Sequence, residues 1–358
     1  MRYRIEKDKL GEVRVPLEAY YGSGAQRSKD LFQVTKHGLI RQMIRSFASI
    51  KKSAAKANAD VGLLDKKIEN AISLACDEIT NGRLHGQFIT DIVQGGSGIA
   101  MNQNANEIIA NRANEILGGE KGKYNFVSPD MVNLNQDDIN IVLLAGKFST
   151  IRLTKKMVSE GKKLLTAINE QIEKTTDSIT LQVLLSQINN FERESKRVST
   201  LLQDLLEINL VARENMDIKD PFVTKFNNYL IKFVGENTKQ IKNPLIFERG
   251  LVDFAYVSGS VKSIMGVVAK GASDLLKLEA EGKLKITYDG TMTIEVVKQI
   301  LLYIIGNDST IQRASESGEL DKNIYIPIVF ACLFETTNLV RRVFRAYREN
   351  VIEKLEIN

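Results

Sequence analysis

At residues 94–107 the chain reads QGGSGIAMNQNANE, a glycine-rich turn followed by asparagines at every second position. The glycines permit positive φ angles and a close backbone approach, and amide side chains can donate to carboxylate oxygens without adding charge. An amphipathic segment, residues 108–117, follows directly. Taken alone, the stretch predicts either a turn that holds a small anion at a helix N-terminus or simply a polar turn that starts a helix.

The composition is that of a soluble, helical protein. The chain has 358 residues, of which 43% are apolar and 26% charged, with five prolines and no tryptophan. This length can bury a large core and hold two or three domains, and the shortage of proline favours helix over strand. We therefore expect an all-α fold. The net charge of +5 comes from 49 basic and 44 acidic residues interleaved along the chain, so we expect no nucleic-acid surface.

Few residues suit redox or metal chemistry. Cys76 and Cys332 lie far apart in apolar surroundings, which indicates buried thiols in a reducing compartment. His37 and His85 are the only histidines, and their spacing fits neither a zinc site nor histidine-based catalysis. The N-terminus has no apolar leader, and no run approaches the roughly 18 apolar residues of a membrane span. We expect a cytoplasmic protein with no cofactor, no metal and no membrane contact.

Hydrophobic periodicity predicts long helices after an irregular start. The first 35 residues show no sustained period. From His37 onward, apolar residues recur every three or four positions, the spacing of one helix face. The predicted helices cover residues 37–50, 63–79, 137–174, 180–213, 221–234, 245–283 and 325–355. Several exceed what one compact domain needs, and their broad apolar stripes predict helix–helix seams and an oligomer.

One segment departs from the helical period. Residues 284–294 read LKITYDGTMTI, with alternating apolar and polar residues on either side of Asp289-Gly290. Asp-Gly tolerates the positive φ angles of a two-residue turn. The segment therefore predicts a short β-hairpin between two long helices.

Several segments together resemble the aspartase/fumarase superfamily, most closely its aspartate ammonia-lyases. The matching segments are RIEKDKLGE at 4–12, VPLEAYYG at 15–22 with Arg27 after it, ACDE at 75–78, QF at 87–88, residues 94–113, LLEINL at 205–210 and IGNDST at 305–310. The match is dense over the first 140 residues and thinner but collinear afterwards.

The resemblance implies a fold and an assembly. Family members have a small N-terminal domain, a central domain of five long helices and a small C-terminal helical domain, and their tetramers build one twenty-helix bundle. We accordingly expect an N-terminal domain over residues 1–130 and a central long-helix domain over residues 131–358, with the hairpin near 284–294. Because the sequence stops at Asn358, we expect no counterpart of the C-terminal domain. We expect a homo-oligomer, either a tetramer or a dimer, and we leave open the presence of a further protein partner.

The resemblance also implies a chemistry. Members eliminate ammonia, water or an amine next to a carboxylate. A base removes the β-proton, and a dense set of donors stabilises the doubly charged intermediate. The positions of this chain that match the substrate pocket are Arg27, Ser97, Asn102, Asn133 and Gln136.

Two matching motifs carry altered residues. The hydroxyl residue that follows the family's glycine turn is replaced by Ile99, which cannot donate to a carboxylate. In the second motif, MVNLNQDDIN at residues 131–140, the hydroxyl-bearing pair becomes Asp137-Asp138, and the next asparagine becomes Ile139. Two carboxylates here either repel a dicarboxylate substrate or are simply acids that favour a helix start.

Two other family motifs are missing. A Gly-Arg-Thr-(His or Gln)-Leu-Gln loop has at best a shortened remnant in residues 180–182. The family's mobile Gly-Ser-Ser loop, whose serine is the base and whose lysine and asparagine hold the substrate, should fall between Ile286 and Val296. There the predicted hairpin closes the gap, and a two-residue turn is too short to act as a lid.

These losses lead to three hypotheses, with no catalytic residue and no metal ligand assigned. The leading one is a pseudoenzyme that keeps the scaffold and serves a structural, regulatory or partner-binding role. The second is an active carbon–nitrogen lyase of altered specificity, in which Asp137 or Asp138 acts as the base. The third is an accessory subunit that lends residues to a full-length relative in a mixed oligomer.

Overall fold

The computed structural model describes residues 2–212, 216–242, 251–318 and 323–357. Within these ranges the chain forms eleven α-helices and only short strands, which confirms the all-α prediction. The chain divides into two compact units, which we call the first and second units. The first contains Met1–Ser149, Leu206–Gly250 and Ser317–Ala331, and the second contains Thr150–Leu205, Leu251–Glu316 and Cys332–Asn358. The domain boundary expected at residue 130 stays a prediction.

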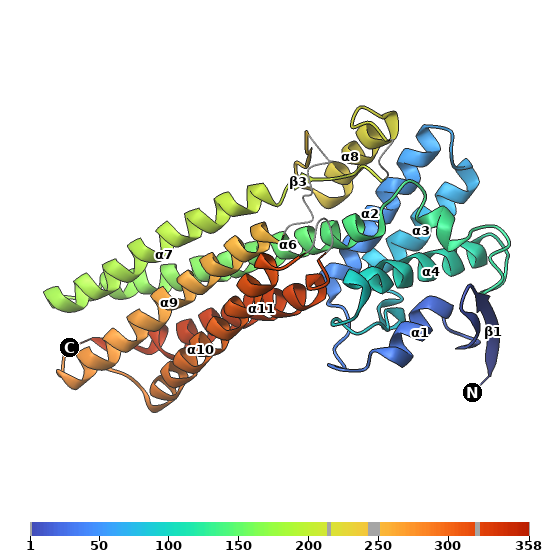
Figure 1. Cartoon of the computed structure of the whole chain (residues 1–358). Helices are drawn as coiled ribbons and strands as arrows, with labels where there is room; N and C mark the ends of the chain where they lie inside the picture. Colours follow the sequence, from blue (N-terminus) through green and yellow to red (C-terminus); the bar gives the residue numbers. More distant parts are fainter. Residues whose placement is uncertain (1, 213–215, 243–250, 319–322, 358) are drawn as a thin grey trace. The chain divides into compact units, whose positions relative to one another are not determined.

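The first unit begins with a hairpin in which β1 (Tyr3–Asp8) pairs antiparallel with β2 (Gly11–Pro16), followed by α1 (Ser23–Leu31) (Figure 1). The prediction that the first 35 residues are irregular is therefore wrong. Each strand is too short to show a clear period in the sequence. The hairpin also depends on contacts outside itself, because the Arg4 guanidinium donates to backbone carbonyls within residues 16–21.

Four longer helices form the core of the first unit. α2 (Arg41–Asp60) packs against α3 (Lys66–Thr80) and α8 (Pro221–Val234), and α4 (Ile99–Ile116) packs against α3. The helices predicted near residues 37–50, 63–79 and 221–234 are thus confirmed. The shorter elements of this unit are η1 (His85–Gln87), η2 (Gly96–Gly98), α5 (Pro129–Val132) and the parallel pair of β3 (Glu207–Ile208) and β4 (Lys239–Gln240).

The second unit is a bundle of long helices (Figure 1). Its complete helices are α7 (Ser178–Asp204), α9 (Val252–Ala280) and α10 (Tyr288–Glu316). It also contains the later parts of α6 (Asp138–Ile172) and α11 (Ile326–Asn350). α9 packs against both α7 and α10, so it forms the centre of this unit.

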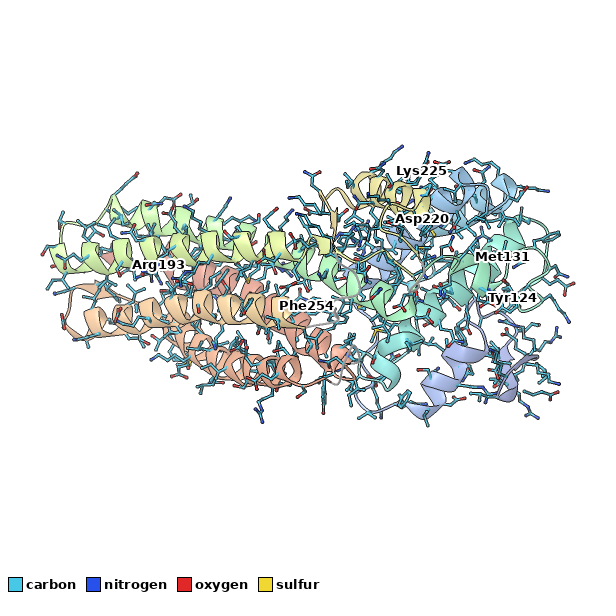
Figure 2. All side chains as sticks on the ribbon, turned by 45° about the horizontal axis from the view of Figure 1, so that its top comes forward. Tyr124, Met131, Arg193, Asp220, Lys225 and Phe254 are labelled. Atoms are coloured by element: carbon cyan, nitrogen blue, oxygen red, sulfur yellow. The ribbon has the colours of Figure 1, made fainter. Side chains whose placement is uncertain are left out.

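More residues are buried along α9 than along α7, in keeping with the central position of α9. In Figure 2, Phe254 marks α9 and Arg193 marks α7. Phe254 is completely buried, whereas the Arg193 side chain is 64% exposed. The long helices predicted from residues 137, 180 and 325 are confirmed, although α7 ends at Asp204 instead of near 213. The first residues of the helix predicted over 245–283 lie outside the described ranges.

The β-hairpin predicted for residues 284–294 is wrong. β5 (Leu284–Lys285) pairs antiparallel with β6 (Glu356–Ile357) near the end of the chain, and α10 begins at Tyr288. The hydroxyl of Thr287 accepts a hydrogen bond from the Gly290 N–H at 3.1 Å, which helps to start the helix.

Packing explains why Asp289 is followed by glycine. A Cβ atom at Gly290 would lie 2.7 Å from Cγ2 of Ile286 and 3.0 Å from the carbonyl oxygen of Asn350. Glycine at position 290 therefore allows close packing against the end of α11. Its φ angle is not positive, so no turn conformation requires it. The Asp-Gly pair, read as a turn from the sequence, lies inside the first turn of a helix.

Cys76 and Cys332 are both free and buried, which confirms the prediction of buried thiols. Among the described helices, α9 alone is long and apolar enough to cross a membrane by composition. However, 56% of its most apolar window is buried inside the chain, as is usual for the core helix of a bundle.

Candidate functional site

The glycine turn begins the candidate site. Gly96, Ser97 and Gly98 have φ angles of 66°, 56° and 87°, and α4 begins directly afterwards at Ile99. A Cβ atom at Gly98 would lie 3.2 Å from Cγ1 of Val142, so both the φ angle and the close approach require glycine. Ser97 is buried, at 5% exposure, in a left-handed conformation that is uncommon for non-glycine residues. The stretch thus forms a tight turn that leads into a helix.

The asparagines after the turn do not act as one row. Because an α-helix turns about 100° per residue, side chains two positions apart point in nearly opposite directions. Asn104 accepts the Ile89 N–H at 2.9 Å and donates to the Gln87 carbonyl at 3.2 Å, so it anchors a loop. Asn102 instead donates to Oδ1 of Asn133 at 3.0 Å. Of these two asparagines, Asn102 is therefore the one that reaches the second predicted motif.

A polar cluster forms where the two motifs meet. The Asn102 side-chain amide also donates to Oδ1 of Asp138 at 2.7 Å, and the Asn133 side-chain amide donates to the same oxygen at 2.9 Å. Asn102 is completely buried, while Asn133 and Asp138 are partly buried. The structure thus brings together two predicted pocket residues and one altered position.

Lys51 belongs to the same cluster, although no sequence motif pointed to it. Its ammonium donates to Oδ1 of Asn133 at 2.7 Å, and its side chain is completely buried on α2. Burial lowers the pKa of Lys51 to about 7, although the negative charge of Asp138 opposes that shift. The available signal was a lysine at helical spacing from the apolar residues Phe47 and Ala54, on the face of α2 that is buried.

The side chains of Asp137 and Gln136 form hydrogen bonds with nearby backbone groups. Asp137 accepts the Asn140 N–H at 2.8 Å, next to the start of α6 at Asp138. The Gln136 side-chain amide donates to the Val132 carbonyl at 2.9 Å, within its own turn. The helix-start interpretation of the two acids therefore describes Asp137, whereas Asp138 also joins the cluster.

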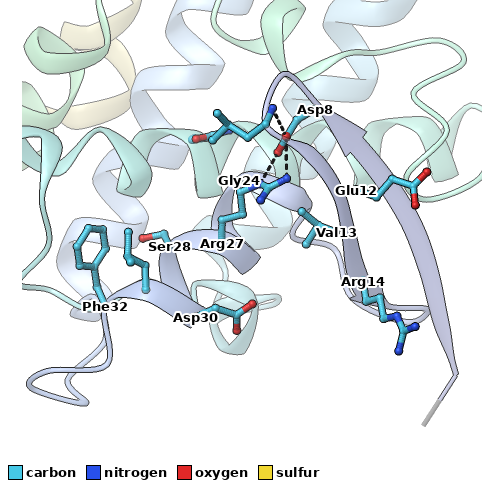
Figure 3. Close-up of a pocket in the computed structure, with 12 residues that line it drawn as sticks. Asp8, Glu12, Val13, Arg14, Gly24, Arg27, Ser28, Asp30 and Phe32 are labelled. Atoms are coloured by element: carbon cyan, nitrogen blue, oxygen red, sulfur yellow. Dashed lines mark hydrogen bonds and ion pairs between the residues drawn. The ribbon is translucent and has the colours of Figure 1, made fainter.

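Arg27 contacts a different part of the first unit. Its guanidinium donates to the two carboxylate oxygens of Asp8, at 2.9 and 3.0 Å, and to the Gly11 carbonyl at 2.9 Å. This ion pair lines a cleft of about 760 Å³ between the β1–β2 hairpin and α1 (Figure 3). Arg27 is therefore engaged with Asp8, and the structure does not bring it into the Asp138 cluster.

Glu107, from the matching stretch, is a second buried ionisable group. Its carboxylate accepts the backbone N–H groups of Gly22, Gly24 and Ala25 at 2.8, 2.8 and 3.2 Å, at the start of α1. Burial raises the pKa of Glu107 to about 7, against the lowering effect of these donors, and the nearby Glu6 adds to the rise. Glu107 thus ties α4 to α1, which is a structural task.

In the second unit, short connections occupy the two places where the missing motifs are expected. Residues 173–177 alone join α6 to α7, and Asp177 accepts the Thr180 N–H at 2.7 Å as the helix cap. The supposed remnant at residues 180–182 is therefore part of a helix. Ile286 and Thr287 alone join β5 to α10. Neither connection contains a loop long enough to cover a substrate.

The chain is similar in sequence and in fold to known lyases. A family model described as Lyase matches residues 11–182. The chain is 30% identical to an aspartate ammonia-lyase of Bacillus sp over 392 residues, covering 99% of this chain and 83% of the relative. It is 31% identical to the aspartate ammonia-lyase of Bacillus subtilis (strain 168), with 99% and 82% covered. The crystal structure of a fumarate lyase:delta crystallin from Brucella melitensis matches with a TM-score of 0.93 at 26% identity, covering 100% of this chain and 85% of that one.

Proposed function

Because the chain belongs to the aspartase/fumarase superfamily, we propose that it is a pseudoenzyme of that family, which keeps the helical scaffold without the elimination chemistry. Its role is then structural, regulatory or partner-binding. We also propose that it acts in the cytoplasm.

The observation that carries this proposal is the short connection before α10. Family resemblance places the mobile loop with the serine base between Ile286 and Val296, yet only Ile286 and Thr287 separate β5 from α10. The alignment with the Bacillus sp relative spans 392 positions, more than the 358 residues of this chain, so segments of the relative have no counterpart here. Without that loop, the connection offers no residue to fill the role of the family's base.

The Asp138 cluster supports the same proposal. The amide groups of Asn102 and Asn133 already donate to a carboxylate of the chain itself, at 2.7 and 2.9 Å. Ile99 provides no hydroxyl beside them. Each donor withdrawn from a developing negative charge typically costs a factor of about 10²–10³ in rate. The loss of several donors is enough to stop the reaction.

A direct assay tests the proposal. Purified protein is incubated with L-aspartate, and fumarate formation is followed by absorbance, with the Bacillus subtilis aspartate ammonia-lyase as positive control. We expect no turnover above background. Turnover that disappears in the Ser97→Ala variant would refute the proposal, because contaminating lyase would be unaffected by that substitution.

An active lyase of altered specificity predicts a different result. In that case a panel of amino acids would yield at least one product, and the Asp137→Ala/Asp138→Ala double variant would lose that activity. Asp137 already caps a helix through the Asn140 N–H, and Asp138 accepts two amide hydrogen bonds. These engagements favour the pseudoenzyme over this alternative.

We further propose a homo-oligomer, tetramer or dimer, built on the second unit. α10 carries exposed apolar side chains at nearly regular helical spacing. They are Tyr288, Met292, Val296 and Tyr303, with exposures of 78%, 37%, 49% and 48%. A stripe of this kind on a soluble helix favours contact with another copy. Native mass spectrometry of the wild-type chain and of Val296→Glu should show a multiple of the monomer mass that the variant reduces.

The accessory-subunit hypothesis predicts a mixed assembly. Co-expression with a full-length aspartate ammonia-lyase would then yield complexes that contain both chains. A homo-oligomer that ignores such a partner would favour the pseudoenzyme acting alone.

A further inference from the structure

The outer edge of β2, the edge that does not face β1, carries open backbone groups. In the β1–β2 pair the Leu17 N–H donates to the Arg2 carbonyl at 3.0 Å, which fixes the order of bonded residues. Because every second residue of an antiparallel pair exchanges hydrogen bonds with its partner, Val13 bonds to β1, whereas Glu12 and Arg14 direct their N–H and C=O groups outward. No described residue forms a backbone hydrogen bond with these outward groups. An open edge of this kind is a template for a further strand.

The cleft between the hairpin and α1 lies along this edge, and residues 12–14 line it (Figure 3). Its volume of about 760 Å³ falls within the range of binding sites. Because neighbouring strands lie about 4.7–4.9 Å apart, a strand added to β2 would occupy the cleft. The other charged residues that line it are engaged, Asp8 with Arg27 at 2.9 Å and Asp30 with a side-chain amide at 2.8 Å.

The walls of the cleft offer apolar surface and one unpaired hydroxyl. Leu10, in the hairpin turn, and Leu31, on α1, are 80% and 72% exposed, and both line the cleft. Ser28 also lines it and is only 6% exposed, yet its Oγ has no hydrogen-bond partner among the described residues. A buried hydroxyl without a partner costs free energy. An occupant of the cleft could cover the leucines and bond to this hydroxyl.

The side chains of β2 specify the order of residues in such an occupant. Directly opposite residues of an antiparallel pair lie on the same face, where opposite charges attract. Arg14 and Glu12 are exposed, so they favour an acidic and a basic residue opposite them. The side chain of Val13, between them, points toward α1 and favours an apolar residue (Figure 3).

We propose that the outer edge of β2 binds an extended peptide segment of a partner protein, which adds as an antiparallel third strand with an acidic, an apolar and a basic residue opposite Arg14, Val13 and Glu12. Because α1 forms the other wall of the cleft, a single strand fits the space better than a second folded hairpin. This inference rests on the proposed function, because it names the class of partner for a chain with a partner-binding role.

The first test measures fluorescence anisotropy of a labelled synthetic peptide, Glu-Val-Arg flanked by threonines, as the full native chain is titrated in. The control peptide has the order Arg-Val-Glu. We expect the native chain to bind the first peptide about tenfold more tightly, because both charge pairs become repulsive in the control. The Glu12→Arg/Arg14→Glu variant should show the opposite preference. Equal binding of the two peptides, or no binding of either, would overturn the proposal.

The second test examines the backbone hydrogen bonds and uses only the native chain, so it holds even if the charge-exchanged variant does not fold. In the bound Glu-Val-Arg peptide, the valine N–H points away from β2 and the glutamate N–H points toward it. N-methylation of the valine should therefore leave binding unchanged, whereas N-methylation of the glutamate should abolish it. The same effect of both modifications would show that the peptide does not add as a strand.

A second copy of the chain is the competing occupant, because residues 12–14 themselves read Glu-Val-Arg. Peptide binding that weakens as the protein is concentrated would identify that copy and overturn the assignment to a partner. The two proposals fail separately. Fumarate production by the native chain would refute the proposed function and leave the peptide result standing, whereas a missing peptide interaction would refute only the β2 site.

Discussion

The ammonium of Lys51 and the side-chain oxygen of Asn133 lie 2.7 Å apart, although 82 positions separate the two residues in the chain. The lysine comes from the buried face of α2, and the asparagine from the loop before α6. Because Asn133 also donates to Asp138, the start of α6 is linked to a charge buried in α2. The protonation state of Lys51 therefore bears on the stability of the first unit.

Lys51 should make stability rise with pH. Burial lowers its pKa from 10.5 to about 7. Between these values the unfolded chain binds more protons than the folded chain, so the free energy of unfolding increases with pH. Below pH 7 both states are protonated, and the full cost of the buried charge remains, on the order of several kcal/mol. Urea unfolding at a series of pH values should show a smaller slope in this window for Lys51→Met.

The matched control for Lys51 is its neighbour Lys52. The Lys52 ammonium pairs with the Asp77 carboxylate at 2.6 Å, and the Asp77 side chain is 48% exposed. Lys52→Met removes a paired lysine from the same helix and so controls for the loss of any lysine charge at this position. If Lys51→Met and Lys52→Met changed the slope equally, the buried lysine would not be the cause.

Asp137 should contribute as a helix cap. Replacing it with alanine removes the acceptor for the Asn140 N–H, which lies at 2.8 Å, and should cost about 1 kcal/mol of stability. Asp137→Asn retains an acceptor oxygen and should cost only a few tenths of that amount. Equilibrium unfolding in urea measures both. A large loss in both variants would mean that the charge matters more than the cap.

Gly290 should tolerate no side chain. A Cβ atom there would lie 2.7 Å from Ile286 Cγ2, so Gly290→Ala should destabilise the chain by about 1–3 kcal/mol despite the better helix propensity of alanine. Gly266, within α9, offers open space, because a Cβ atom there would have no neighbour within 4 Å. Gly266→Ala should therefore be neutral or stabilising by up to about 1 kcal/mol. Thermal unfolding of both variants would reveal the contrast, and equal effects would argue against the packing explanation.

Arg27 should act through Asp8. Its guanidinium holds the pKa of Asp8 below the ordinary value of 3.8. The pair should therefore stabilise the fold above about pH 4 and lose its contribution as the pH falls through the lowered pKa. Because both side chains are partly exposed, a double-mutant cycle of Arg27→Ala and Asp8→Ala should give a coupling of only about 0.5–1 kcal/mol. Additive effects of the two substitutions would show that the pair does not anchor the hairpin.

The long helices could be predicted because their signal is local. Apolar residues at helical spacing mark α6, α7 and α11 directly, since each residue's position in the period decides which face it occupies. The glycine turn was equally readable, because positive φ angles such as those at Gly96 and Gly98 favour glycine.

The errors have a common physical origin. The β1–β2 hairpin depends on Arg4 contacts with residues 16–21, which no local period reveals. The Asp289-Gly290 pair favours a turn locally, but close packing against Asn350 uses the same glycine inside a helix. Lys51 belongs to no sequence motif, and only its position on the buried face of α2 sets it apart.

The sequence by itself determined the helical class, the family and the departures from the family's motifs. These properties depend only on local hydrophobic periodicity and on residue identities at fixed spacing. Only the tertiary structure decided which polar groups meet. It joined Asn102 to Asp138, across 36 positions, and separated Arg27 from both. The physical reason is that a hydrogen bond depends on distance in space, and the packing of α2, α4 and α6 sets those distances without leaving a local pattern in the chain.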